Sequence, residues 1–152
     1  MEIGEKGLLI LRALQRDATL TMQDLGKEVG MSQASVWRRV QDLEKAGVIS
    51  ARVALVDPRA VGLKASVITN VTLRDHSPES RAEFERFVTD RPEIMECYSV
   101  SGAYDYILSV RVEDVEAYER FLMNHLLASP VVVSAASAFT LRQLKYTTAL
   151  PL

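Results

Sequence analysis

Apolar residues in the first third of the chain recur at helical spacing. They predict three helices, over about residues 5–16, 22–29 and 33–46. Thr21, followed three residues later by Asp24, resembles a capping box at the start of the second helix. Gly30 suits the left-handed position after that helix, Ser32 is a good N-cap for the next one, and the small Gly26 allows the third helix to approach closely. Two helices joined by a short turn that contains glycine predict a helix-turn-helix.

The third predicted helix has an inward and an outward face. Val36, Val40 and Leu43 are spaced i, i+4 and i+7, so they point into the core, and Trp37 is expected to be half-buried beside them. The outward face and its flanks carry small polar groups and arginines, which suit readout of the DNA major groove. The candidate DNA-binding residues are Ser32, Gln33, Ala34, Ser35, Arg38, Arg39, Gln41 and Lys45. The alternative is that these residues form only a solvated helix face.

The rest of the chain shows mainly the alternating pattern of strands. The Val-rich segment 48–57 predicts one or two short strands, in the place of a wing, before a connector that begins at Asp57-Pro58. Further strands are predicted over about 65–73, 94–100, 106–112 and 131–141, and helices over 78–89 and after Asp114. The order β-α-β-β-α-β is that of the ferredoxin-like unit, so the whole chain is α+β. Both strand faces carry apolar residues, which predicts that the face without helices is buried against a second copy.

Composition narrows the class of protein. The chain has 152 residues, 48% hydrophobic and 25% charged, with a net charge of −2. No apolar run approaches the ~20 residues of a membrane span, and no signal peptide is expected. The single Cys97 forms no internal disulfide and fits the reducing cytoplasm, and one Cys with two His disfavours a zinc site. Residues 1–60 carry 9 Lys and Arg against 8 Asp and Glu, so DNA binding requires a small, placed basic patch.

At this point the sequence resembles the Lrp/AsnC (feast/famine) transcriptional regulators over nearly its whole length. The matching stretches are LQRDATLTMQDLGKEVGMSQASVWRRVQDLEKAGVI, ALVDPRAVGL, PEIMECYSVSGAYDYILSVRVED, YERFL and LKYTTALPL. Many regulators share the helix-turn-helix, whereas the hairpin around Gly-x-Tyr-Asp-Tyr is far more specific. The resemblance implies a winged helix-turn-helix over 1–50, a wing strand and connector over 51–64, and a ferredoxin-like domain for effector binding and oligomerisation over 65–152.

The resemblance also implies partners. These are double-stranded DNA, a small effector such as an amino acid bound between dimers, and a homodimer that assembles into rings such as octamers; no cofactor, metal or membrane is implied. Carried over by position, the effector-binding residues are those of the hairpin turn: Ser101, Gly102, Ala103, Tyr104 and Asp105. Many family members have Asp where this chain has Ala103, which predicts weak amino-acid binding or a less polar effector. Asp105 itself either receives a ligand ammonium or bonds nearby backbone N–H groups.

Two other classes of protein remain as alternatives. Dimeric ferredoxin-like domains also house cofactor-free monooxygenases, and siroheme decarboxylases resemble this family with a helix-turn-helix attached. An acid–base enzyme needs titratable groups that converge in a pocket, whereas His76 and His125 lie outside the predicted strands. The third class is an assembly protein without an effector response. The sequence therefore favours a ligand-modulated transcriptional regulator that is not an enzyme.

Overall fold

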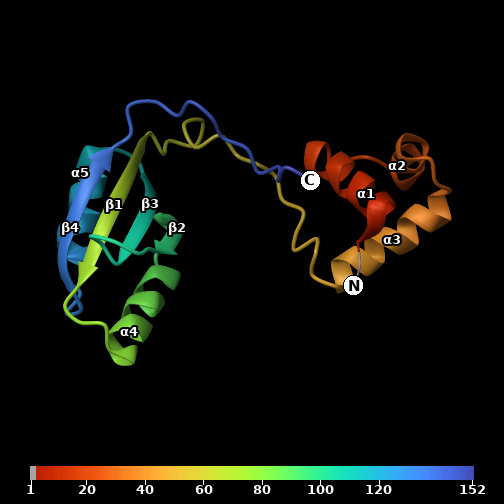
Figure 1. Ribbon diagram of the computed structural model, residues 1–152. Helices are drawn as coiled ribbons and strands as arrows, with labels where there is room; N and C mark the ends of the chain where they lie inside the picture. Colours follow the sequence, from red (N-terminus) through yellow and green to blue (C-terminus); the bar gives the residue numbers. More distant parts are fainter. Residues whose placement is uncertain (1–2) are drawn as a thin grey trace. The chain divides into compact units, whose positions relative to one another are not determined.

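The computed structural model describes residues 3–152 and divides the chain into two compact units. One unit is helical and extends to Leu55, and it also contains the C-terminal residues Leu144–Leu152. The other unit, Val56–Gln143, contains the sheet (Figure 1). The sequence predicts a second domain over 65–152, whereas the contacts of the structure group the last nine residues with the helical unit. Among residues 3–152, no helix is long and apolar enough to cross a membrane.

The helical unit consists of three helices, as the sequence predicts. They are α1 (Gly4–Arg16), α2 (Met22–Val29) and α3 (Gln33–Lys45). Their apolar stripes meet in one core, in which Ile10, Leu25, Val36 and Leu43 are fully buried. Burying one such side chain contributes about 1.5–3 kcal/mol, and this shared core holds the exposed face of α3 in a fixed position.

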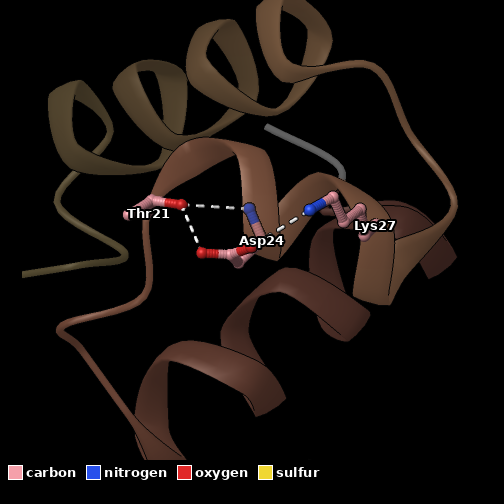
Figure 2. Close-up of polar contacts among 3 residues, drawn as sticks. All are labelled: Thr21, Asp24 and Lys27. Carbon is pink, nitrogen blue, oxygen red and sulfur yellow. Dashed lines mark hydrogen bonds and ion pairs between the residues drawn. The ribbon is translucent and has the colours of Figure 1, made fainter.

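The start of α2 is fixed by the predicted pair of Thr21 and Asp24. The Thr21 hydroxyl accepts a hydrogen bond from the Asp24 backbone N–H at 3.1 Å and donates one to the Asp24 carboxylate at 2.7 Å (Figure 2). In a capping box the carboxylate reaches back to the backbone N–H of the cap residue. Here it bonds the hydroxyl instead, because Asp is one methylene shorter than Glu. Lys27 approaches the same carboxylate at 3.4 Å.

The turn between α2 and α3 depends on two glycines. Gly30 adopts φ +64°, the left-handed conformation expected after a helix. A Cβ on Gly26 would lie 2.7 Å from the backbone oxygen of Met31, closer than real side chains come. Gly26 therefore allows close approach of the turn before α3, rather than of the body of α3. Ser32 then caps α3 by accepting the Ser35 N–H, as predicted.

The strands predicted within 48–57 are not formed, and residues 46–64 contain no strand. The segment instead leaves α3 by a turn in which the N–H groups of Val48 and Ile49 donate to the Leu43 carbonyl. Val53 remains 73% exposed. β-propensity measures how well a side chain fits a packed, paired strand, and among residues 3–152 no strand pairs with this segment.

The second unit has the predicted order of elements. They are β1 (Ala65–Leu73), α4 (Pro78–Thr89), β2 (Ile94–Ser99), β3 (Tyr106–Val112), α5 (Val115–Phe121), a π-helix (Leu122–Leu126) and β4 (Val132–Phe139). The sheet is antiparallel in the order β2-β3-β1-β4, which confirms the ferredoxin-like arrangement (Figure 1). The last strand is shorter than the predicted 131–141.

The two faces of the sheet differ in burial. Val67, Thr69 and Val71 of β1 point to the helix side and are fully buried, and the Thr69 hydroxyl lies 2.7 Å from that of Tyr118 on α5. The register places the alternate residues on the open face, which has no helix. Apolar side chains there come from several strands: Ile68, Tyr98, Ile107, Ala136 and Ala138. Polar side chains such as Asn70, Ser109 and Arg111 lie between them, and this is the face for which the sequence predicts a second copy.

The C-terminal segment lies against α1. The Gln15 side chain accepts from the Leu150 N–H at 2.7 Å and donates to the Leu150 carbonyl at 3.3 Å. Arg12 donates to the Leu152 carbonyl at 2.8 Å. These bonds explain why the segment belongs to the helical unit, although it follows the sheet in sequence.

Candidate nucleic-acid interface and effector turn

The N-terminal half of α3 presents the polar face that the sequence predicts. Gln33, Ala34, Ser35 and Arg38 are exposed. Within residues 3–152, Arg38 takes part in none of the four ion pairs, and the Asp42 carboxylate one turn later does not pair with it. A free guanidinium on an exposed helix face can donate two parallel hydrogen bonds to guanine or contact a phosphate.

The surface around Ala34 is hollowed on both sides. One open hollow of about 540 Å³ lies between the start of α2 and Trp37, and a second of about 310 Å³ lies beside Arg38. Trp37 is 57% exposed, so the expectation that it is half-buried in packing is wrong. The buried residues Val36, Val40 and Leu43 form a stripe along one side of α3, and the Trp37 side chain lies outside this stripe. It therefore adds an aromatic surface to the candidate interface.

Other predicted DNA-binding residues are engaged within the protein. Arg39 donates to the Ile3 carbonyl at 2.7 Å and is half-buried, so its guanidinium holds the start of α1. Gln41 donates to Glu44 at 3.1 Å, and Glu44 in turn pairs with Arg52 at 2.8 Å. The helical periodicity of the sequence places Arg39 beside Arg38 on the outer side of α3. It gives no information about the contact between Arg39 and the start of α1. Lys45 is exposed near the end of the helix.

The hydroxyl groups of the predicted interface are partly used for capping. Ser32 donates to the Ser35 hydroxyl at 2.8 Å and accepts from the Ser35 N–H at 3.2 Å. The structure therefore brings together Ser32, Gln33, Ala34, Ser35 and Arg38 at the exposed start of α3. Trp37 also lies on this surface, although it was not among the candidate DNA-binding residues. Its place in the sequence, directly before the outward-facing Arg38, is consistent with this position.

The predicted effector turn joins β2 and β3. Ser101, Gly102, Ala103 and Tyr104 are all exposed, and Gly102 has φ +126°, a conformation that favours glycine. Nothing lies within 4 Å of a Cβ built at Gly102. The turn is therefore open to contact with another molecule.

Asp105 fastens the end of this turn to β1. Its carboxylate accepts from the Leu73 N–H at 2.8 Å and from His76 at 2.6 Å, and its own N–H donates to the Val71 carbonyl at 2.9 Å. The bond from Leu73, and then that from His76, lower the pKa of Asp105 below its usual value. Of the two predicted roles, the structure shows the bond to a backbone N–H. The sequence placed His76 outside the predicted strands and gave no sign of this pairing across 29 residues.

The bond between Asp105 and Leu73 is expected to weaken in acid. A folded-state pKa below the unfolded value means that the ionised form stabilises the fold above that value, and that this stabilisation is lost as the pH falls through the folded pKa. As the pH falls below 3.8 and through the lower folded pKa of Asp105, the Leu73 amide should therefore lose protection, measured as its exchange rate relative to the intrinsic rate at the same pH. Hydrogen exchange followed by NMR between pH 5 and pH 2.5 measures this change.

Two variants make this measurement specific. Asp105→Asn removes the titration at Leu73, so the protection of this amide should no longer fall as the pH is lowered. Asp57→Asn is the matched control, because Asp57 also accepts a backbone N–H, that of Arg59, but in the connector. An unchanged pH dependence at Leu73 in Asp105→Asn contradicts the assignment.

The capped helices, the exposed start of α3 and the order of the sheet define the class of this protein. It is a DNA-binding helix-turn-helix protein with a ferredoxin-like second unit. Comparison with known proteins agrees. The model of the Lrp/AsnC ligand binding domain matches residues 66–150, and that of a winged helix-turn-helix DNA-binding domain matches residues 5–50. The glutamate uptake regulatory protein of Zymomonas mobilis is 36% identical over 151 residues, which cover 99% of this chain and 92% of that protein. The DNA-binding transcriptional activator DecR of Escherichia coli is 34% identical over 143 residues, 94% of each chain.

Solved structures show the same relationship. A transcriptional regulator from Neisseria meningitidis in complex with L-methionine superimposes with a TM-score of 0.94 at 31% identity, over 99% of this chain and 97% of the other. This chain belongs to the Lrp/AsnC family. It is a DNA-binding transcriptional regulator, and its relatives are regulators rather than enzymes, which decides against the monooxygenase and decarboxylase alternatives.

Proposed function

We propose that this regulator, working in the cytoplasm, reads duplex DNA with the exposed start of α3, and that Arg38 contacts a base edge. The observation that carries the proposal is the guanidinium of Arg38, which is exposed on the outward face of a capped helix and takes part in no ion pair within residues 3–152. Gln33, Ala34 and Ser35 lie beside it, where side chains in a helix-turn-helix meet the major groove. Arg39 and Gln41 support the helix from within the protein, and Lys45 adds a positive charge near its end.

The DNA-binding unit is proposed to be a homodimer formed through the open face of the sheet. The apolar residues on that face support this, because a face without helices leaves them to contact water. Two copies of α3 would then meet successive major grooves roughly 34 Å apart, so the operator is expected to be a pseudo-palindrome. Association of such dimers into rings such as octamers is the further step implied by the family.

Titration of the promoter region next to the protein's own gene tests this proposal. Fluorescence anisotropy should show specific binding whose log affinity falls with log salt at a slope of about −0.9 per neutralised phosphate. Sedimentation of the same samples should show a dimer or a multiple of it at micromolar concentration. A flat salt response contradicts the proposed interface, and a stable monomer contradicts the dimer.

A small effector is proposed to bind at the turn 101–105. The open backbone at Gly102 supports this, because free N–H groups in such a turn can receive a carboxylate. Regulators similar to this chain, from Neisseria meningitidis and Mycobacterium tuberculosis, form complexes with L-methionine. Ala103 offers no polar group, so amino acids are expected to bind weakly or less polar effectors to be preferred.

Calorimetry with the common amino acids checks the effector. Ala103→Asp should strengthen binding about tenfold to hundredfold, because an unpaired charged group in a closed pocket costs about 1–3 kcal/mol. Gly102→Val should abolish binding, since φ +126° disfavours a side chain there. Sub-micromolar amino-acid binding that survives Gly102→Val would place the effector elsewhere.

A further inference from the structure

We propose a second small-molecule site at the far end of β3 from the turn 101–105. A pocket of about 300 Å³ lies there, walled by the connector, the ends of β2 and β3, and the helical segment 115–126. The seven residues of β3 separate the two ends by roughly 20 Å, so the pocket is independent of the proposed effector turn. The residues that carry the argument are Leu63, Glu93, Arg111, Arg120, Phe121 and His125.

The walls of this pocket are held by backbone hydrogen bonds. The Arg111 N–H donates to the Glu93 carbonyl at 2.8 Å, which joins β3 to the start of β2. The Lys64 N–H donates to the Glu113 carbonyl at 3.2 Å, which holds the connector against the end of β3. The pocket is therefore part of the folded sheet unit rather than a gap beside a loose segment.

The charges around the pocket are not compensated by the protein. Within the described chain, 3–152, the four ion pairs include none of the titratable residues that line the pocket: Glu93, Arg111, Glu113, Arg120 and His125. One carboxylate oxygen of Glu93, Oε2, is buried without a hydrogen-bond partner. Arg91, two residues away, lies over the Phe87 ring at 5.4 Å instead of pairing with Glu93. A carboxylate in this state gains from a cation that approaches it through the pocket.

The helical wall has an unusual conformation at the same place. After Phe121 the chain continues as a π-helix over Leu122–Leu126, closed by a bond of 2.8 Å from the Leu127 N–H to the Leu122 carbonyl. Single π turns are rare and occur frequently at functional sites. This one carries His125, which lines the pocket. The π-helix is thus a second observation, independent of the charges, at the same wall.

The chemistry of the lining selects a small dipolar molecule, with one anionic and one cationic group on a short apolar body. Arg120 and Arg111 supply positive charge for a carboxylate. Glu93 and Glu113 supply negative charge for an ammonium, and Leu63 and Phe121 supply apolar surface. A volume of about 300 Å³ is at the small end of ligand pockets. A ligand with only a negative charge would leave the Glu93 carboxylate unpaired. A ligand with only a positive charge would leave Arg111 and Arg120 unpaired.

NMR titration of the full-length protein tests the proposal. The probes are the common zwitterionic amino acids, each compared with its N-acetyl and its carboxamide derivative, which remove one charge at a time. We expect amide shifts at residues 93, 111–113 and 120–125 for at least one zwitterion, with affinity at least tenfold lower for both derivatives. Glu93→Gln and Arg120→Gln should each weaken binding at this site at least tenfold. Arg86→Gln, an exposed change on α4, is the control and should leave it unchanged.

Each outcome decides the question. Shifts confined to residues 101–105 overturn the second site and leave the proposed effector turn standing, whereas shifts confined to the pocket do the reverse. Equal binding of a zwitterion and of its two singly charged derivatives overturns the dipolar ligand. Undiminished binding in both Glu93→Gln and Arg120→Gln overturns the assigned residues. Because Glu93 is partly buried, thermal unfolding of each variant is compared with the parent, and Arg111→Gln replaces any variant that does not fold.

Discussion

Arg38→Ala is expected to weaken specific DNA binding by about 1–3 kcal/mol, roughly 5- to 150-fold in affinity, and to relax sequence preference at the contacted base pair. The guanidinium is exposed on α3 and has no ion pair within residues 3–152, so its removal leaves the fold unchanged. Anisotropy titration with the specific operator and with a scrambled duplex measures both effects.

Two arginines provide the controls for this prediction. Arg86→Ala, on the exposed side of α4, should change neither stability nor DNA binding. Arg39→Ala should mainly lower the stability of the helical unit, because Arg39 bonds the Ile3 carbonyl rather than facing outward. If folded Arg38→Ala retains full affinity and preference while Arg39→Ala loses them at unchanged stability, the assignment of the two neighbouring arginines is reversed.

The helix-turn-helix could be predicted from the sequence because its signals are local. Ser32 caps the helix that begins at the next residue, and Gly30 ends the helix just before it. Apolar spacing then fixes which side of α3 is buried, as it did for Val36 and Leu43. Each of these features depends on residues within about two turns of one another, so no tertiary information was needed.

The engagement of Arg39 could not be predicted in this way. Its partner is a backbone carbonyl at Ile3, 36 residues earlier, and any residue type presents a carbonyl. The same reason applies to the C-terminal segment, where Gln15 bonds the backbone of Leu150. Side-chain bonds to distant backbone groups leave no pattern in a single sequence, and they decide which polar residues remain free for function.

The order of strands and helices along the second unit could be predicted from the alternating pattern of apolar residues. The strand predicted within 48–57 shows that this pattern alone does not establish a strand. In β1 the alternation predicts a strand, and β3 and β4 pair with it on either side. The segment around Val53 and Leu55 has comparable β-propensity, but no strand within residues 3–152 pairs with it, so it forms no strand and remains exposed. The link from Asp105 to His76 and Leu73 likewise required knowledge of which strands are adjacent.

Phe84→Ala is expected to destabilise the sheet unit by about 3–5 kcal/mol, the largest effect of a single change considered for this chain. Phe84 is fully buried on the inner side of α4, and its ring lies 4.6 Å from that of Tyr106. Truncation loses the transfer free energy of the ring and leaves a cavity that the rigid sheet only partly fills. Urea unfolding, followed through the NMR signals of the sheet unit, measures the loss.

The effect should extend to the turn 101–105, the proposed effector site. Tyr106 begins β3 directly after Asp105, so loss of the ring beneath it loosens the base of the turn. Amide exchange at Leu73, which bonds the Asp105 carboxylate, should then be faster in Phe84→Ala even where the unit remains folded. Phe139→Ala is the matched control, because it removes the same ring from a position that is 43% exposed, and should cost less than half as much. Equal destabilisation by the two variants would show that the core of this unit is not centred on Phe84.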